Sequence, residues 1–129
     1  MPTIFTRIIN GEIPCYKIAE DASYFAFLDI NPLSKGHTLV VPRREVDYIF
    51  DLDTDTYTGL MAFSQKVALA IGSAVPCLRV GVAVIGLEVP HAHVHLIPLH
   101  SGSIDFSHPK LKLDKEELER IASAIREKM

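Results

Sequence analysis

The stretch PHAHVHLIP, residues 90–98, decides how this chain folds, because imidazole and apolar side chains alternate along it. Successive side chains of a β-strand point to opposite faces of the sheet. We therefore predict a strand over 89–99 in which His91, His93 and His95 share one exposed face, while the apolar residues between them anchor the other face in the core. Three alternating imidazoles have no comparable packing role, so they are candidates for chemistry.

Outward from this strand, the sequence predicts three further strands. Residues 24–28 are aromatic-rich and run into a turn that ends at Pro32, and residues 37–42 are β-branched and end in a proline. We expect these two to form an antiparallel pair. Residues 78–84 form a short apolar stretch, which is typical of a strand buried on both faces, and Gly86 allows a turn before the histidines.

Two helices are predicted. Apolar residues recur at spacings of three and four over 53–72, with an acidic start and Gly72 at the end. A second amphipathic stretch over 114–128 begins with Asp114 and Glu117, the spacing of a capping box. Because strands and helices do not alternate regularly, we expect an α+β fold on an antiparallel sheet, with one main helix and a C-terminal helix. Residues 1–129 are predicted to form a single domain, with a core over about 4–98 and a C-terminal extension.

Charge and hydropathy exclude several classes of protein. The 129 residues carry 13 Lys and Arg against 16 Asp and Glu, a net charge of −3, so no broad positive field attracts a nucleic acid. The sequence has no uninterrupted apolar run of about 18 residues, the length that spans a membrane. We expect a cytoplasmic protein with neither nucleic acid nor membrane as a partner.

The three histidines leave two kinds of chemistry open. A neutral imidazole is a nucleophile near neutral pH, and it is equally a common ligand of zinc, copper or nickel. Alternating histidines can converge on one ion, although a stable site also needs further ligands and an ordered surrounding shell. The spacing of the three histidines alone does not show whether they act as a nucleophile or as metal ligands.

The motif H-x-H-x-H followed by two apolar residues resembles the signature of the histidine-triad (HIT) family, in its Hint-like branch. Four upstream segments are also similar to that family: Ile4-Phe5, GEIP at 11–14, FLDINP at 27–32 and KGH at 35–37. Several such motifs in one order make chance an improbable explanation. The resemblance implies a HIT-like fold with a five-stranded antiparallel sheet, and a homodimer.

The resemblance also implies roles for single residues. His93 would attack the α-phosphorus of a nucleotide and form a covalent nucleotidyl-histidine, while His95 would contact the phosphate and help the leaving group. His91 would support the geometry around His93, and His37 would complete the catalytic cluster. The implied nucleotide-binding residues are Asp29 for the ribose hydroxyls, apolar base-pocket residues and the loop before the triad: Asp29, Ile30, Phe27, Ile4, Phe5, Ile8, Ile13, Glu88 and Val89.

Two departures from the family pattern bear on substrate and metal. Leu87 and Glu88 stand where many relatives have a glycine-glutamine segment, so a carboxylate comes close to the phosphate site. It could repel a polyphosphate, act as an acid or accept a hydrogen bond from an amine leaving group, and the last of these favours phosphoramidates. Thr3 and Thr6 replace a cysteine pair that binds structural zinc in some bacterial relatives, so we predict no metal.

The function predicted from sequence is hydrolysis at the α-phosphorus of nucleoside 5′-phosphoramidates or related phosphoanhydrides, on a purine nucleotide or nucleotide conjugate and without a cofactor. Three alternatives stay open. The chain could be a purine nucleotide sensor without activity, a dinucleoside polyphosphate hydrolase or nucleotidyltransferase, or a metal-binding protein that uses its histidine cluster.

Overall fold

The computed structural model describes residues 2–129. In chain order its elements are α1 (Ile4–Ile9), β1 (Lys17–Glu20), β2 (Tyr24–Leu28), β3 (Thr38–Pro42), the short 3-10 helix η1 (Ile49–Asp51), α2 (Thr54–Ala74), β4 (Arg79–Ala83), β5 (Val94–Leu99) and α3 (Lys115–Arg126). No helix in this part of the chain has the length and apolar character needed to cross a bilayer.

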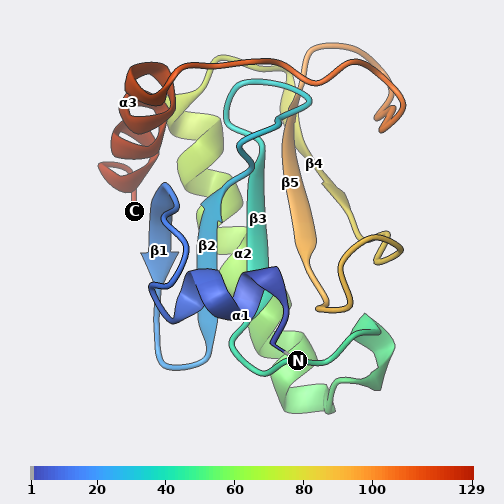
Figure 1. Ribbon diagram of the computed structural model, residues 1–129. Coiled ribbons are helices and arrows are strands. Elements are labelled where there is room, and N and C mark those ends of the chain that lie inside the picture. Colours follow the sequence, from blue (N-terminus) through green and yellow to red (C-terminus); the bar gives the residue numbers. More distant parts are fainter. Residues whose placement is uncertain (1) are drawn as a thin grey trace.

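The five strands form one antiparallel sheet in the order β1-β2-β3-β5-β4, which confirms the predicted α+β class. The expected pairing of 24–28 with 37–42 is also confirmed, with Ala26 opposite Val40. In Figure 1, α1 crosses one face of the sheet and α2 lies behind the other. The strand β5, which carries His95, therefore lies inside the sheet, between β3 and β4.

The main core fills the space between the sheet and the two longer helices. Ala92, Val94 and Leu96 belong to it, as the alternation predicted, and each is at most 1 % exposed. A second, smaller core covers the opposite face, where α1 packs. It consists of Phe5, Phe25, Phe27, Leu39 and Val41.

The prediction that the histidines occupy an exposed strand face was wrong in two respects. The β5 ladder begins only at Val94, because the N–H of His91 bonds to the carbonyl of Val89 at 2.8 Å and turns the chain before the strand. The three imidazoles are also buried, at 0 %, 6 % and 9 % exposure for His91, His93 and His95. Phe5 of the second core covers two of them, since its ring packs edge-on against both His91 and His93, while the ring of Phe106 lies edge-on to His95.

The main helix starts as predicted and ends later than predicted. The carboxylate of Asp53 caps its first turn by accepting the N–H of Thr56. The helix then continues through Gly72 to Ala74, so Gly72 does not end it. It stops because Val75 precedes Pro76, and the residue before a proline is driven into the extended conformation that Val75 adopts.

The strand predicted over 78–84 forms as β4, but it is not buried on both faces. It lies at the edge of the sheet, Arg79 is exposed and Val82 is 52 % exposed. An apolar stretch of this length shows that a strand is favoured, whereas its burial depends on whether another strand lies beyond it.

The C-terminal helix α3 is part of the main core. Asp114 caps it by accepting the N–H of Glu117, as predicted, while the Glu117 carboxylate pairs with Lys35 and Arg120. Its apolar stripe packs into the main core through Leu118, Ile121, Ala122 and Ile125. Residues 100–114 connect β5 to α3 and loop across the end of the sheet on the way (Figure 1).

Candidate active site

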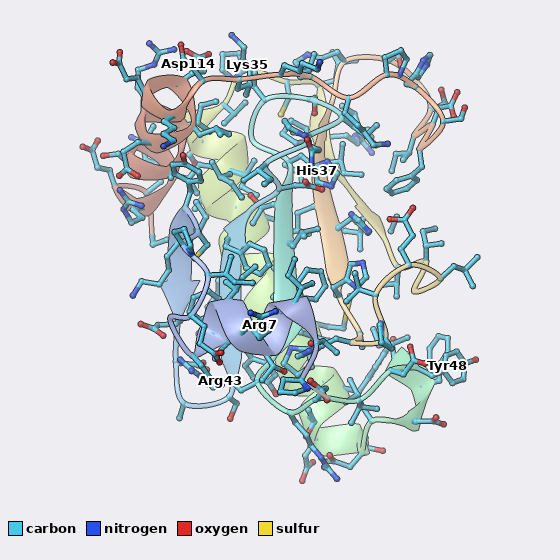
Figure 2. The ribbon with its side chains drawn as sticks, in the orientation of Figure 1. Arg7, Lys35, His37, Arg43, Tyr48 and Asp114 are labelled. Carbon is cyan, nitrogen blue, oxygen red and sulfur yellow. The ribbon has the colours of Figure 1, made fainter. Side chains whose placement is uncertain are left out.

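A pocket of about 310 Å³ lies beside β5 and holds two of the three triad histidines. Figure 2 places His37 at the start of β3, next to β5. The histidines are buried and form the inner part of the pocket, while the β4–β5 loop and the segment after β5 form its outer part. The lining residues are Asp29, His37, Ile85, Gly86, Leu87, Glu88, His93, His95, Phe106 and Lys110.

The main-chain carbonyl of His91 orients His93. The Nδ1 of His93 lies 2.8 Å from that oxygen, and a carbonyl can only accept a hydrogen bond. The proton of the neutral ring therefore sits on Nδ1, and the lone pair sits on Nε2. This is the tautomer that a nucleophilic imidazole requires.

A chain of hydrogen bonds likewise sets the tautomers of His37 and His95. The N–H of Leu33 donates to Nδ1 of His37 at 3.0 Å, so the proton of His37 lies on Nε2. That Nε2 is 3.0 Å from Nδ1 of His95 and donates to it. His95 in turn carries its proton on Nε2, where it can donate to a ligand in the pocket.

Burial keeps these imidazoles neutral. Desolvation lowers the pKa of His37 to about 3, and the charges of His95, Lys110 and His93 act in the same direction. The pKa of His95 falls to about 4, again mainly by desolvation. Asp29 lies 3.8 Å from His37, and burial raises the pKa of its carboxyl. At neutral pH His37 and His95 are therefore uncharged, and they act inside the pocket as hydrogen-bond donors and acceptors.

His91 lies outside the pocket and is held by a separate polar cluster. Its Nε2 donates to the carbonyl of Pro42 at 2.7 Å, and its Nδ1 accepts the hydroxyl of Thr3 at 2.8 Å. The carboxylate of Glu45 accepts both the N–H of Thr3 and the hydroxyl of Thr6, each at 2.7 Å. The residues that replace the cysteine pair thus anchor His91 to α1 by hydrogen bonds.

A metal ion does not fit the histidine cluster as it stands. Ligand atoms of Asp29, His37 and His95 lie within 4.8 Å of one another, which is the right scale for a cation. The Nε2 of His37, however, carries the proton, because its Nδ1 accepts the N–H of Leu33. Ligation through Nε2 would break that bond or require a doubly deprotonated ring. The hydrogen bonds from Leu33 to His37 and from His37 to His95 need a proton on His37 Nε2, the position that a metal ion would occupy.

The residues predicted for nucleotide binding divide into three groups. Asp29 and Glu88 line the pocket with the histidines. Phe5 and Phe27 are buried in the second core, against which Ile8 and Val89 pack. The other three lie outside that pocket lining, with Ile4 and Ile30 exposed and Ile13 half-buried: Ile4, Ile13 and Ile30.

Sequence analysis missed Phe106 and Lys110, which also line the pocket. The ring of Phe106 lies edge-on to His95 with centroids 4.9 Å apart, and Lys110 donates to the Phe106 carbonyl at 2.6 Å. The stretch after Pro98 carries no motif, and its only signal was an aromatic and a basic residue in a Ser-Gly-rich loop. The two histidines of this stretch, His100 and His108, are exposed and do not line the pocket.

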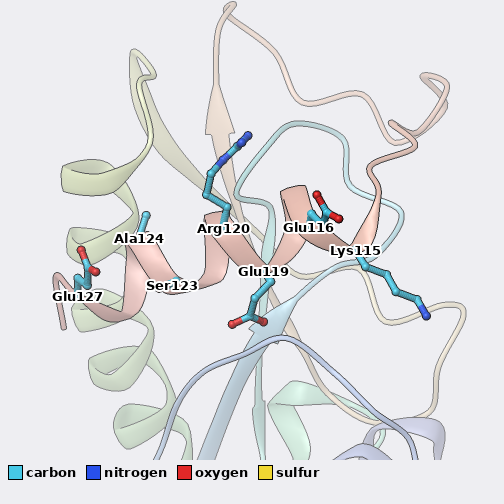
Figure 3. A pocket seen from close by; sticks show the side chains of 7 residues that line it. All are labelled: Lys115, Glu116, Glu119, Arg120, Ser123, Ala124 and Glu127. Carbon is cyan, nitrogen blue, oxygen red and sulfur yellow. The ribbon is translucent and has the colours of Figure 1, made fainter.

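A second, wider hollow runs along the exposed side of α3 (Figure 3). Residues of α3 and its C-cap Glu127 line it, mostly charged ones such as Lys115, Glu119 and Arg120. Because α3 packs beside β1, at the opposite edge of the sheet from β4, this hollow is separate from the histidine pocket.

Comparison with known proteins agrees with this geometry. The HIT domain family matches residues 10–102. The chain is 33 % identical to adenosine 5′-monophosphoramidase hnt1 of Schizosaccharomyces pombe, over all of this chain and 99 % of that protein. A Hit-like protein from Bartonella henselae has the same fold, with a TM-score of 0.86, 32 % identity and coverage of 98 % and 96 % of the two chains. A zinc-bound histidine triad protein from Mycobacterium smegmatis superposes with a TM-score of 0.80 at 25 % identity, covering 97 % of this chain and 91 % of its own. The chain belongs to the HIT domain family.

Proposed function

We propose that this protein is a nucleotide hydrolase that cleaves nucleoside 5′-phosphoramidates or related phosphoanhydrides at the α-phosphorus, through a covalent intermediate on His93. The observation that carries the proposal is the 2.8 Å bond from Nδ1 of His93 to the His91 carbonyl, which leaves the Nε2 lone pair available. The phosphoramidase named among its relatives, alike over nearly its whole length, supports the same reaction class.

The first step forms a bond between Nε2 of His93 and phosphorus, and breaks the bond from phosphorus to the leaving atom. The electron pair of the broken bond goes to the leaving group. A phosphate departs as its anion, while an amine takes a proton from solvent at the open side of the pocket. His95 Nε2–H donates a hydrogen bond to the phosphoryl group, and such preorganised donors are often the largest contribution to catalysis.

The second step is attack of water on the nucleotidyl-histidine. The water oxygen bonds to phosphorus, the P–Nε2 bond breaks, and its electron pair returns to His93. The excess proton of water passes to solvent, so the enzyme recovers its starting tautomers. Splitting one displacement into two steps is the general advantage of covalent catalysis.

Nucleotide placement is the next part of the proposal. We assign the Asp29 carboxylate to the ribose hydroxyls, because it lines the pocket 3.8 Å from His37 and offers two acceptor oxygens. Exposed Ile30 and half-buried Ile8 and Ile13 are available to a purine base, and Ile8 packs against the buried cluster that contains Phe5 and Phe27. The N–H groups near Glu88 and Val89 would face the phosphate.

A homodimer completes the proposal. The strand β4 is a sheet edge with exposed Val82, and the apolar side chains of Tyr48, Phe50 and Leu87 are 58 %, 67 % and 88 % exposed. Unpaired edges and large apolar patches are typical of interfaces. Sedimentation at several protein concentrations would measure the assembly state, and a monomer at every concentration would remove this part of the proposal.

The decisive experiment is turnover of adenosine 5′-phosphoramidate by the wild type and by His93→Ala, each with and without a strong chelator. We expect hydrolysis that the chelator does not affect and that His93→Ala lowers by at least about a thousandfold, as for loss of a covalent nucleophile. A matched control is His100→Ala, which removes an exposed imidazole near the end of β5. No turnover by the wild type would favour the sensor, and turnover lost to the chelator alone would favour a metal site.

A further inference from the structure

The segment between β5 and α3, residues 100–114, which we name the strap, is packed against the histidine pocket. The N–H of Leu111 bonds to the carbonyl of Pro32 at 2.8 Å, so the far part of the strap is tied to the loop before β3. A Cβ on Gly81 would lie 3.0 Å from Ile104, which shows that the strap packs closely on β4. Between these two points lies Phe106, whose ring contacts His95.

The strap brings an ammonium group to the rim of this pocket. The Nζ of Lys110 donates to the main-chain carbonyl of Phe106 at 2.6 Å and lies 5.7 Å from the centroid of the Phe106 ring. An ammonium group has three hydrogens to donate, so one bond leaves two for a ligand. The bond to the Phe106 carbonyl therefore holds the Lys110 ammonium at the pocket and leaves two of its N–H groups free to bind a ligand.

Lys110 changes the charge balance of the pocket. The pocket contains the carboxylates of Asp29 and Glu88, and among the lining residues of the described chain Lys110 is the one Lys or Arg. The field of Lys110 reaches the inner groups, because it contributes to lowering the pKa of His37 and that of His95. With neutral imidazoles inside, Lys110 is the charge that can offset the two carboxylates when an anion binds.

We propose that Lys110 binds phosphate groups beyond the α-phosphate, so that the strap makes this site selective for ligands and leaving groups that carry additional negative charge. The inference rests on the proposed function, which assigns the α-phosphate to His93 and His95. Those two side chains are 6 % and 9 % exposed, whereas Lys110 is exposed. A chain of phosphates that starts at His93 and extends toward solvent would reach the strap.

Glu88 acts against Lys110 at the same rim. It also lines the pocket, and its charge contributes to raising the pKa of Asp29. Taken alone, Glu88 disfavours polyphosphates, as the sequence indicated. In the folded protein the charges of Lys110 and Glu88 together set the preference for additional phosphate groups. Removing the charge of Lys110 should weaken this preference, and removing the charge of Glu88 should strengthen it.

The test measures the affinities of AMP and ADP by calorimetry for the wild type, Lys110→Met and Lys112→Met. ADP is supplied as the analogue with a methylene group in place of its bridging oxygen, because the proposed hydrolysis cannot cleave a P–C bond. We expect Lys110→Met to weaken ADP binding by about tenfold, the effect of one charge-assisted hydrogen bond, and AMP binding by less than about threefold. Lys112→Met removes the same charge from an exposed strap residue outside the pocket lining, and should leave both affinities within about twofold. Glu88→Gln should tighten ADP relative to AMP.

The outcomes separate this inference from the proposed function. If the wild type binds both nucleotides but the ratio of their affinities is the same in Lys110→Met, the inference is wrong and the proposed function stands. This outcome includes an equal loss of affinity for AMP and ADP. A wild type that binds neither nucleotide would overturn the proposed function itself. Unchanged thermal unfolding of the two lysine variants would show that folding does not account for the difference.

Discussion

His91 and His95 flank His93 at the same distance in sequence, yet they lie in different surroundings. His91 is fully buried outside the pocket, between the Thr3 hydroxyl and the Pro42 carbonyl. His95 lines the pocket and is held by His37 on one side and by Phe106 on the other. The comparison teaches that the spacing of a motif selects candidates, while the groups that contact each imidazole determine its role.

The two environments also differ in how they constrain the nucleophile. His91 acts on His93 through its main-chain carbonyl, which any residue at that position would supply. His95 acts through its side chain, whose proton is directed by a bond from His37. The side chain of His91 should therefore matter mainly for stability, and that of His95 mainly for turnover.

Among the variants that test this comparison, His95→Ala should have the largest effect. Removing a preorganised donor to the phosphoryl group should lower kcat for adenosine 5′-phosphoramidate by about a hundredfold to a thousandfold. Steady-state kinetics beside a thermal unfolding curve would measure this, with His100→Ala as the control. A loss below about tenfold in a folded variant would contradict the assigned role.

His91→Ala should show the reverse pattern. It removes a fully buried ring and leaves the Thr3 hydroxyl without its acceptor, so the free energy of unfolding should fall by about 3 kcal/mol. The main-chain carbonyl that orients His93 remains, and kcat in the folded variant should fall by less than about tenfold. Urea denaturation and kinetics on the same preparation would test both. A His91→Ala variant that is stable but inactive would contradict the assignment of the His91 side chain to stability.

The stability of the protein should depend on pH because of two histidines that line the pocket, His37 and His95. In the folded protein the pKa values of His37 and His95 are held at about 3 and about 4, below the ordinary 6.5. As pH falls below 6.5, the unfolded chain therefore takes up protons that the folded protein does not, and the free energy of unfolding decreases. Each histidine should contribute up to about 1.4 kcal/mol per pH unit until its folded pKa is reached.

Urea denaturation between about pH 6.5 and 5.5 would measure this slope, in a window at least about one pH unit above the ordinary carboxyl pKa values. The pKa of His91 is also lowered by burial, so His91 adds to the slope in the same direction. A His37→Asn variant should show a shallower dependence than the wild type. Stability that is flat over this window would mean that the imidazoles are not kept neutral by burial.

The smallest effect should come from Thr3→Val, which tests the hydrogen bond that holds the His91 side chain. The Thr3 hydroxyl both bonds to His91 and accepts the N–H of Thr6 at the start of α1. Its loss should lower the free energy of unfolding by about 1 kcal/mol, with little change in kcat. Thr3→Ser keeps the hydroxyl and is the matched control. Equal stability of the two variants would show that the hydroxyl does not hold His91.

Much of the fold followed from local patterns that are physically strong. The Asp53 and Asp114 caps, the pairing of the two upstream strands and the apolar face opposite the histidines were all predicted, since each depends on neighbours in sequence or on the period of a strand. The errors concern burial and boundaries. An apolar stretch cannot reveal that β4 lies at a sheet edge, nor can alternation reveal that α1 covers the imidazoles.

The site divides in the same way. His37, Asp29, Glu88, His93 and His95 were predicted from motifs, and the fold brings them to one pocket. Neither the bond from Thr3 to His91 nor the bond from Thr3 to Glu45 was predicted, because each joins segments distant in sequence. Phe106 and Lys110 lie in a stretch without a motif, and the strap alone places them beside His95.

By itself, the sequence determined the α+β class, the apolar face that anchors the histidine segment in the core and the residue types available for chemistry, because side-chain period and capping act over a few residues. Only the tertiary structure decided which nitrogen of each imidazole carries a proton, which histidines line the pocket and which cation lines it together with Glu88. These properties depend on burial and on hydrogen bonds between distant segments, and neither exists until the chain has folded.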